Sequence, residues 1–359
     1  MTQIRAFRAK LKCKQRSAGS LCLAIILLLG FSSPFISWAA LPGEKGWEPP
    51  LGLNADSIVI PKDNPMTKEK VELGKLLFFD KRLSKNNTIA CASCHMPNVA
   101  FTDGQPVSTG IHRLQGGRSA PTAINRLFSS AQFWDGRAAT LEEQSTGPFV
   151  SPVEHGFANH DELVAKVKTI EGYTTLFQQV FDGPATKHRI GQAIASFQRT
   201  LLSGNSPYDK FNSDKDSKAL SASAQKGLEL FRGKALCFTC HSGANFADEK
   251  FHNLGVDWDS DHVDLGRYTV TKQPKDMGAF KTPTLREIAH TAPYMHDGRF
   301  GTLQEVVDFY NRGGIANPHK DPFMQPLELS NQEIEELVEF LHSLSGEGWQ
   351  METPTKFPQ

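Results

Sequence analysis

The sequence has few cysteines, no excess of basic residues and no long apolar run. Its 359 residues include six cysteines, and 39 Lys and Arg residues balance 39 Asp and Glu residues. This balance argues against a nucleic-acid-binding protein, which needs a basic surface. The apolar run at residues 21–31 is too short, and too close to the start of the chain, to favour a permanent membrane span.

The first 39 residues have the pattern of an export signal. They contain six basic and no acidic residues, then the apolar run, and they end on the small-x-small pattern Ser37-Trp38-Ala39. An uncleaved membrane anchor is the alternative. Cleavage would leave 33 basic against 39 acidic residues, a formal net charge of −6. A mildly acidic exported protein without stable membrane insertion favours a basic soluble partner.

Four cysteines remain after cleavage, in two C-x-x-C-H motifs, CASCH and CFTCH. Their thiol and imidazole residues are Cys91, Cys94, His95, Cys237, Cys240 and His241. The pattern is typical of c-type haem attachment, in which two thiols bond to the porphyrin and the adjacent imidazole reaches the iron. The sequence therefore predicts two covalently bound haem c groups.

Three other interpretations of the cysteine pairs fit less well. A zinc site has its two C-x-x-C halves about 15–20 residues apart, whereas these pairs lie 146 residues apart. A thioredoxin-type motif occurs once and needs no histidine. Disulfides within C-x-x-C would be strained and would leave both histidines unexplained.

The rest of the sequence predicts a mainly α-helical protein with two cytochrome-c-like haem domains and long loops. Amphipathic helices are predicted at 71–80, 161–170, 191–202, 225–234 and 331–344. Asn331 is the expected N-cap of the last helix. The polar stretch at 203–221 marks a boundary. We therefore predict a signal peptide at 1–39, an N-terminal haem domain at 40–205 and a C-terminal haem domain at 206–359.

One segment of the sequence occurs twice at a constant offset of 162 residues. The copies that begin at Pro121 and Pro283 agree at eight positions, but one reaches Pro148 where the other reaches Tyr310. If this place lies on the distal side of each haem, a phenol closes one iron, whereas proline has no donor atom and leaves the other open. A peroxidase needs this asymmetry. The alternative for Tyr310 is a core aromatic residue.

Several other residues compete with Tyr310 as ligands of the second iron. They are Met277, Met295, Met324, His252, His290 and His296. From the sequence alone, the choice among these residues and Tyr310 stays open.

An open haem also needs a group that moves a proton between the two peroxide oxygens during O–O cleavage. Glu154 follows Pro148 closely and is the candidate, with Gln144 as an orienting amide. Trp134, in the FWDGR turn, is a candidate electron carrier between the haems. Each has an ordinary alternative, a solvated surface carboxylate for Glu154 and a core aromatic for Trp134.

The motifs together closely resemble those of the bacterial di-haem cytochrome c peroxidases and their MauG relatives, over almost the whole mature chain. They are LGKLLFFDKRLS, CASCH, FWDGRAATLEEQ, PVEHG, CFTCHSG and TAPYMHDGRFGTLQEVVDFYNRGG. The resemblance implies a periplasmic enzyme whose N-terminal haem reacts with hydrogen peroxide and whose C-terminal haem supplies the second oxidising equivalent.

The resemblance also implies roles for individual residues. His95 and His241 are then the proximal iron ligands, and Trp134 lies between the haems. Gln144 and Glu154 lie over the peroxide site. Tyr310 falls where peroxidases of the family have an axial Met and MauG has a Tyr, and an anionic oxygen ligand lowers the iron potential relative to a thioether. At this position the sequence therefore resembles MauG more than the peroxidases. The resemblance implies that Tyr310 is an iron ligand.

Two positions depart from the family pattern. Peroxidases that need reductive activation cap the resting iron with a His in the loop after the first haem, where this sequence has Ile111 followed by His112. We therefore expect an open first haem. A loop shifted by one residue, which brings His112 to the iron, is the alternative. MauG passes oxidising equivalents to its protein substrate through a Trp shortly before the second C-x-x-C-H, and this chain has Ala235 there.

The family also binds calcium between its domains. The resemblance implies backbone ligands at Thr291 and Pro293, whereas the position of the family's Asn ligand is Ser119 here. The resemblance therefore predicts a calcium ion, although Ser119 departs from the family's ligand pattern.

The resulting hypothesis is a periplasmic di-haem peroxidase that reduces hydrogen peroxide with electrons from a small redox protein, either a monohaem cytochrome c or a copper protein. One alternative is MauG-like oxidation of side chains on a partner protein. A second is a non-enzymatic di-haem electron-transfer cytochrome. A homodimer is compatible with the sequence, which does not fix the oligomeric state.

Overall fold

Helices form most of the regular structure of the computed structural model, which describes residues 40–58, 60–213 and 216–359. Their bounds are α1 Lys68–Phe79, α2 Leu141–Gln144, α3 His160–Lys168, α4 Glu171–Phe181, α5 Lys187–Gln198, α6 Pro207–Asn212, α7 Ala222–Arg232, α8 Tyr268–Thr271, α9 Leu303–Asn311 and α10 Asn331–His342. The prediction of a mainly α-helical fold is confirmed. The signal-peptide prediction for residues 1–39 lies outside the described residues.

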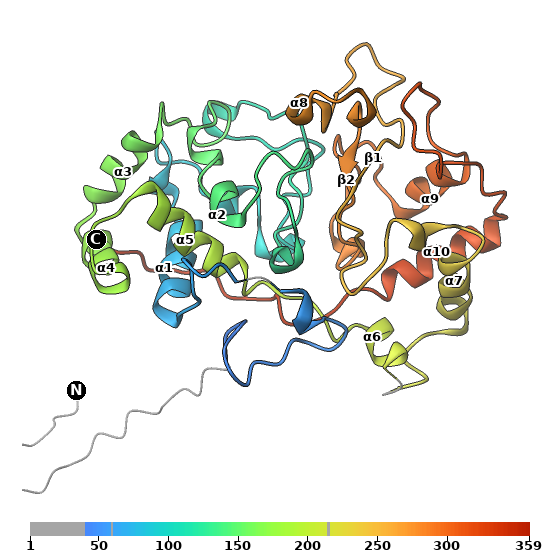
Figure 1. Ribbon diagram of the computed structural model, residues 1–359, viewed down its shortest axis with the longest axis horizontal. Helices are drawn as coiled ribbons and strands as arrows, with labels where there is room; N and C mark the ends of the chain where they lie inside the picture. The colour runs from blue at the N-terminus through green and yellow to red at the C-terminus, as the bar shows by residue number, and fades with distance from the viewer. Residues whose placement is uncertain (1–39, 59, 214–215) are drawn as a thin grey trace, which may run out of the picture. The chain divides into compact units, whose positions relative to one another are not determined.

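Strands are short and few in the described part of the chain. β1 (Phe251–His252) and β2 (Phe280–Lys281) pair antiparallel, with Phe251 opposite Lys281. In Figure 1 this pair lies between α1–α5 on one side and α7, α9 and α10 on the other. Among the described residues, no helix has the length and apolar character needed to cross a membrane.

The first half of the described chain is built on the packing of α1 against α5. Gly74 permits the close approach, because a Cβ atom there would lie 1.9 Å from the carbonyl oxygen of Ala193. One turn later, Phe78 packs against Phe197 with ring centroids 5.2 Å apart. Glycine weakens an isolated helix, but here its missing side chain lets the two helices touch.

The second half repeats this arrangement with α7 and α10. A Cβ atom on Gly227 would lie 1.9 Å from the carbonyl oxygen of Glu336. Phe231, one turn later, lies with its ring centroid 5.0 Å from that of Phe340. The spacing of Gly and Phe that the sequence shows twice therefore corresponds to two equivalent helix pairs.

Two details of the second half differ from the sequence-based expectation. The N-cap of α10 is Ser330 and the prediction of Asn331 was wrong, because Ser330 and Glu333 bond to each other's backbone N–H in a capping box. The stretch at 203–221, expected to mark a domain boundary, contains α6, whose Tyr208 packs edge-on against Phe340 with ring centroids 5.7 Å apart. The domain boundary at 205/206 stays a prediction.

The C-terminal segment returns from the second half to the first. Gly204 and Glu347 exchange backbone hydrogen bonds of 3.3 and 2.8 Å. Trp349 is buried in the hydrophobic core of the first half. The backbone N–H of Gly172 in α4 donates to the carbonyl of Gln359 at 2.6 Å. Figure 1 shows this red segment running past α1 and ending beside α4. The last residues of the chain are therefore part of the first half.

Candidate active site

The repeated sequence segment forms the same turn in both halves. The residues that flank FWDGR form an isolated β-bridge between Gln132 and Ala138, and those that flank MHDGR form one between Tyr294 and Phe300. In each turn the Arg backbone N–H donates to the Asp two residues earlier, at 3.2 Å. The identity of the two sequences therefore reflects a common backbone conformation.

The helix that follows each turn begins alike and ends differently. Thr140 caps α2 and Thr302 caps α9 through hydrogen bonds of 3.1 and 3.2 Å from the backbone N–H three residues on. α2 ends at Gln144, and Pro148 then opens a 3-10 turn. Proline has no N–H with which to continue the hydrogen bonds of a helix. α9 continues to Asn311 and thereby carries Tyr310.

A cavity of about 410 Å³ opens in the first half beside the first cysteine pair. Its walls include the residues that the sequence analysis placed at the first haem, which are Cys91, Cys94, His95, Trp134, Gln144, Pro148 and Glu154. Segments up to 63 residues apart thus meet at one cavity, which we call the first cavity.

The imidazole of His95 has only one nitrogen left for a metal. Its Nδ1 lies 3.0 Å from the carbonyl oxygen of Phe101, and because a carbonyl only accepts, Nδ1 carries the proton. Burial lowers the pKa of His95, while the carbonyls of Phe101 and Pro121 act in the opposite direction. The imidazole is therefore neutral, with Nε2 as the available ligand atom.

Glu154 is a partly buried carboxylate at the edge of the first cavity. Burial raises its pKa above the usual range, and the Ser151 side chain and the charge of Arg137 only partly oppose this. Its own backbone carbonyl accepts from the N–H of Ile111 at 2.9 Å. The carboxylate therefore sits in a segment fixed to the loop that follows the first haem motif.

That loop presents no histidine to the first cavity. Ile111 is buried, with 2% of its surface exposed, and its neighbour His112 is exposed and does not line the cavity. The close contact of Gly110 with the carbonyl of Val153, where a Cβ atom would lie only 2.0 Å away, fixes the loop in this position. The expectation of an open first haem stays a prediction, and the position of His112 does not oppose it.

The structure adds a residue beside Gln144 that the sequence analysis missed. Gln198, at the end of α5, also lines the first cavity, and its amide lies 3.4 Å from Oε1 of Gln144 and donates to the Ser145 hydroxyl at 3.0 Å. The two glutamines are 54 residues apart in sequence, so only the amphipathic pattern of α5 could have indicated that Gln198 faces inward.

A second cavity of about 230 Å³ lies beside the second cysteine pair. Its lining includes the second thiols and imidazole together with Tyr310. Nδ1 of His241 donates to the carbonyl of Phe246 at 2.9 Å, so Nε2 is again the available ligand atom. Burial and the nearby Cys237 and Cys240 raise the pKa of Tyr310, whose hydroxyl has no hydrogen-bond partner among the described residues.

Three histidines were alternatives to Tyr310 as ligands of the second iron. Two of them form hydrogen bonds with aspartates, and the third lies outside the second cavity. Both ring nitrogens of His252 are bonded, Nδ1 to Asp321 at 2.6 Å and Nε2 to Asp248 at 3.0 Å. Nε2 of His296 bonds to Asp257 at 2.9 Å. His290 is exposed and is not part of the cavity lining.

Of the three methionines, two remain competitors. Met295 and Met324 line the second cavity together with Tyr310, whereas Met277 does not. Ala235 is buried and also lines this cavity, at the position where MauG has a Trp. The second cavity therefore offers Tyr310, two thioethers and Nδ1 of His296 as ligand atoms for the iron.

Trp134 stands in the wall that the two cavities share. Its indole N–H donates to the carbonyl of Ser119 at 2.9 Å, and its own carbonyl accepts from the backbone N–H of Lys281 at 2.8 Å. Both bonds fix the indole between the two sites.

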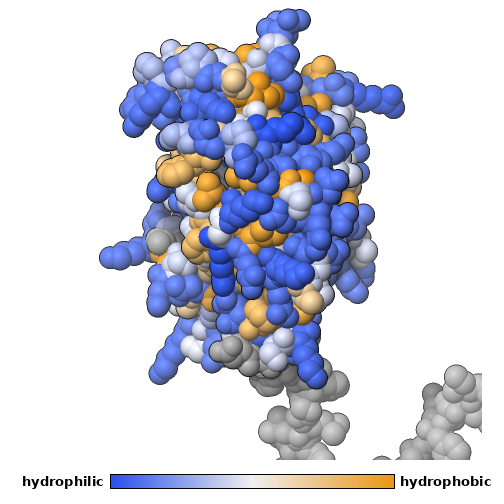
Figure 2. All heavy atoms as spheres, turned by 90° about the vertical axis from the view of Figure 1, so that its right-hand side faces the viewer, coloured by the Kyte–Doolittle hydropathy of each residue, from blue (hydrophilic) through white to orange (hydrophobic). Residues whose placement is uncertain are grey.

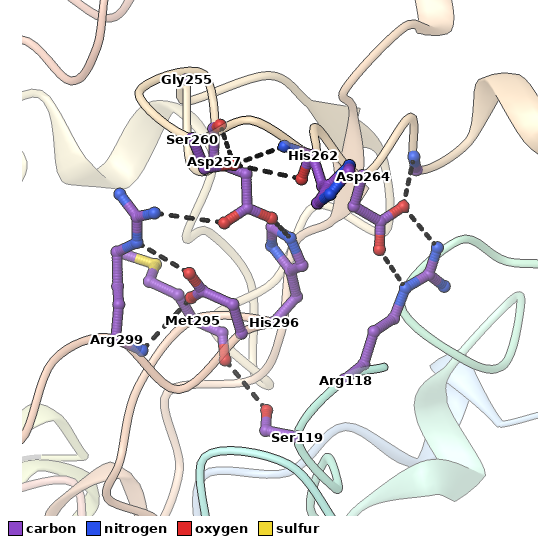
Figure 3. A network of polar contacts seen from close by, with 12 residues as sticks. Arg118, Ser119, Gly255, Asp257, Ser260, His262, Asp264, Met295, His296 and Arg299 are labelled. Carbon is purple, nitrogen blue, oxygen red and sulfur yellow. Dashed lines mark hydrogen bonds and ion pairs between the residues drawn. The ribbon is translucent and has the colours of Figure 1, made fainter. Parts of the chain in front are cut away.

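Polar contacts join the two halves beside this wall. Figure 3 shows the Arg118 guanidinium against Asp264 of the second half, with hydrogen bonds of 2.7 and 2.9 Å, and the Ser119 hydroxyl donating to the carbonyl of Met295 at 2.9 Å. Arg118 also pairs with Asp135 of the first half at 2.7 Å. The loop that precedes the repeated segment is therefore attached to the second half.

Both cavities suit a c-type haem. Each offers two cysteines that are not in disulfides and one neutral imidazole whose remaining nitrogen is a metal ligand. This combination defines a cytochrome c site, and the chain contains it twice.

The comparisons with known proteins agree with this combination. Residues 68–217 match the family model of di-haem cytochrome c peroxidase, and residues 224–345 match that of cytochrome c. Methylamine utilization protein MauG of Methylophilus methylotrophus is 40% identical over 89% of this chain and 93% of its own length. Cytochrome-c peroxidase IdrP1 of Denitromonas iodatirespirans is 38% identical over 90% and 93%, respectively.

A solved structure is similar over the same range. It is that of a MauG-like protein associated with microbial copper homeostasis, with a TM-score of 0.75 and 34% identity over 86% of this chain and 96% of that one. The chain belongs to the di-haem cytochrome c peroxidase and MauG family, whose members are oxidoreductases that act on peroxide. The predicted resemblance, the fold of two cytochrome-c-type domains and the enzyme class are confirmed, and membership implies two c-type haems.

Proposed function

We propose that the protein reduces hydrogen peroxide to water in the first cavity, with electrons that a small redox protein delivers through the second. The main support for this proposal is that the two cavities have equivalent thiols and imidazoles but otherwise different linings. The first has Pro148 and the partly buried carboxylate of Glu154, and the second has Tyr310. Two electrons and two protons convert each peroxide to two waters, so the first cavity needs a proton carrier.

Glu154 is the proposed proton carrier. When bound, the haem supplies the redox chemistry of O–O cleavage. The ionised carboxylate of Glu154 accepts a proton from one peroxide oxygen and returns it to the oxygen that leaves as water. Burial raises the pKa of Glu154, so the carboxylate holds a proton more readily than an ordinary glutamate does. Gln144, supported by Gln198, orients the peroxide through its amide.

Tyr310 is the proposed sixth ligand of the second iron. Its hydroxyl faces a cavity without another polar partner among the described residues, and a phenolate oxygen lowers the potential of iron relative to a thioether. Closing this site with a protein ligand excludes peroxide from it. Trp134, fixed between the cavities, is the proposed route for electrons from the second site to the first.

The edge of the second site is the proposed entry point for electrons. Leu236 and Phe238, on either side of Cys237, are 47% and 46% exposed, so apolar side chains surround the cysteine pair. Figure 2 shows that the end of the molecule formed by the second half is otherwise largely hydrophilic, with separate apolar patches. A monohaem cytochrome c or a copper protein in the periplasm is the proposed donor.

A MauG-like oxidation of a partner protein is the second candidate function. Tyr310 and the 40% identity to MauG favour it. Ala235 weakens it, because a buried methyl group cannot carry an electron to a protein substrate at the position of the MauG Trp. A purely electron-transferring cytochrome would need both irons to be six-coordinate, and Pro148 has no donor atom to offer the first.

Calcium and dimer formation stay predictions. Thr291 and Pro293 line the second cavity, and Ser119 uses its hydroxyl for the carbonyl of Met295 at 2.9 Å. The proposed calcium site would therefore need backbone carbonyls and water in place of a Ser119 ligand.

Steady-state peroxide consumption by the holoprotein with a reduced monohaem cytochrome c tests the proposal. Rapid stoichiometric oxidation of the donor, two per peroxide, supports the peroxidase. Negligible turnover with a slowly decaying oxidised protein supports the MauG alternative. Electron paramagnetic resonance of the oxidised protein tests the third possibility, because low-spin signals from both haems and no high-spin signal would establish an electron-transfer cytochrome.

A further inference from the structure

The wall between the two cavities contains one charged residue. Among the described residues, six line both cavities, and these are Ser119, Ala120, Pro121, Thr122, Arg126 and Trp134. Five of them are uncharged, so a cation at Arg126 faces both sites at once. The family resemblance and the proposed reaction give this guanidinium no role.

Arg126 has no carboxylate partner within the described chain. Its Nε donates to Oε1 of Gln132 at 3.1 Å. The acid that attracts it, Glu249, has its own partners, since Oε1 lies 2.8 Å from Nζ of Lys281 and Oε2 accepts from the backbone N–H of Ser130 at 2.7 Å. Burial lowers the pKa of Arg126, and Glu249 opposes this only in part.

The other two arginines of the first cavity are paired. Arg118 bonds to both Asp135 and Asp264, and Arg137 bonds to Asp135 at 3.0 Å. Protein side chains therefore neutralise these guanidinium groups before any ligand arrives. Arg126 differs, because its terminal nitrogens are left to whatever enters the cavities.

Arg126 is half-buried, and ligands that fill the two cavities would remove its charge from water. A guanidinium removed from water without a counter-ion destabilises a protein, so Arg126 then needs an anion. The ligand that both cavities suit, a c-type haem, carries two propionate carboxylates. A guanidinium fork binds carboxylates through two parallel hydrogen bonds, which makes arginine a better partner for them than lysine.

We infer that Arg126 binds propionate carboxylates of both haem groups from the wall between them, with Gln132 as the residue that orients its guanidinium. Gln132 is suited to this because its own amide donates to the carbonyl of Ser129 at 3.3 Å, which leaves its oxygen for Arg126. The turn that begins at Gln132 also carries Trp134. The same turn therefore positions both the proposed electron carrier and the guanidinium of Arg126.

A shared cation changes the electrochemistry of both sites. Positive charge favours the reduced form of each iron, which carries one electron more, and the effect is strong because the surroundings are largely dehydrated. Removing the charge should therefore stabilise the oxidised form of both haems. This inference depends on the two haems of the family but not on the proposed peroxide chemistry.

The test is a spectroelectrochemical titration of the Arg126→Gln holoprotein in the absence of peroxide. At a fixed applied potential, the ratio of reduced to oxidised haem should fall roughly tenfold at both sites. Arg113→Gln is the matched control, because Arg113 is exposed and lines neither cavity, and it should leave both ratios unchanged. Unchanged ratios in Arg126→Gln, or a change at one haem alone, would overturn the shared site.

Arg126→Lys provides an independent test if Arg126→Gln does not fold. Lysine keeps the charge but loses the bidentate fork, so the titration should stay close to that of the wild type. The propionate bending bands in the resonance Raman spectrum should shift, because the hydrogen bonds to the carboxylates change. Propionate bands identical to those of the wild type would contradict the inference even if the potentials behave as expected.

Discussion

The first and second cavities are built from the same structural elements, but the helix that follows the repeated turn differs in length. In both, a C-x-x-C-H motif lies beside a helix pair that meets at a glycine, and the same turn leads into a helix capped by threonine. The helix stops after Gln144 in the first half and continues through Tyr310 in the second. The two cavities therefore differ in the length of this helix, with Pro148 beyond the short one and Tyr310 on the long one. In the proposed function, this difference distinguishes the cavity that admits peroxide from the cavity that supplies its own ligand.

The largest expected effect is the loss of the proton carrier in the first cavity. We expect Glu154→Gln to lower the rate of peroxide reduction by about 10²- to 10⁴-fold, the usual contribution of a general acid–base group. Both haems should stay attached. Stopped-flow mixing of the holoprotein with peroxide measures the rate. Glu171→Gln, in the exposed first turn of α4, is the control and should react like the wild type.

The equivalence of the two helix pairs is the next target. Gly74→Ala and Gly227→Ala each place a methyl group against a backbone carbonyl, and each should lower the free energy of unfolding by about 1–3 kcal/mol. Urea unfolding followed by circular dichroism measures the change. A large effect in one half and none in the other would show that the repeated Gly does not have the same packing role twice.

Exposed positions of the same helices supply the controls for these glycines. Glu72→Ala in α1 and Glu229→Ala in α7 change residues that face solvent. Both should leave the unfolding midpoint close to that of the wild type, because alanine is a good helix former.

Removing the phenol should change the second site alone. We expect Tyr310→Phe to raise the ratio of reduced to oxidised second haem roughly tenfold at a fixed potential, because an anionic ligand is lost. The direction is opposite to that for Arg126→Gln. Tyr294→Phe is the control, since Tyr294 also lines the second cavity but its hydroxyl donates to the carbonyl of Ile288 at 3.0 Å. An unchanged Tyr310→Phe titration would indicate that a methionine or His296 is the ligand.

The smallest expected effect is on the pH dependence of peroxide reduction, whose rate should begin to fall at a higher pH than an ordinary glutamate would give. Glu154 acts in its ionised form, so the rate should fall as the pH drops through its pKa. Since burial raises this pKa, the fall should begin at a higher pH than for an ordinary glutamate. Measuring the rate of peroxide reduction from pH 4 to 8 checks this, and Glu154→Gln should lack the limb. A wild-type profile that is flat down to about pH 4.5 would contradict the burial argument.

The sequence predicted the parts of the site that depend on nearby residues. Gln144, Pro148 and Glu154 follow one another closely, and a repeat with a constant offset placed Pro148 and Tyr310 in corresponding positions. These residues do line the two cavities. Local patterns carry this information because turns and caps are set by residues three or four positions apart.

The parts that were missed depend on long-range contacts. Gln198 reaches Gln144 from another helix, and Arg126 has no charged counterpart in the second copy of the repeat, where Ile288 stands. The N-cap of α10 was placed one residue late, because Ser and Asn are both good caps and only the partner Glu333 selects Ser330. Nothing in the periodicity of residues 346–359 indicates that they pack on the first half.

That final segment sets an order of assembly. Trp349 fills the core around α1 and α5, and Gln359 bonds to Gly172. A ribosome makes the residues of α1–α5 first, yet their core is complete only after residues 349–359 have been made. Loss of residues 349–359 would therefore damage the first half, although these residues are far from it in sequence.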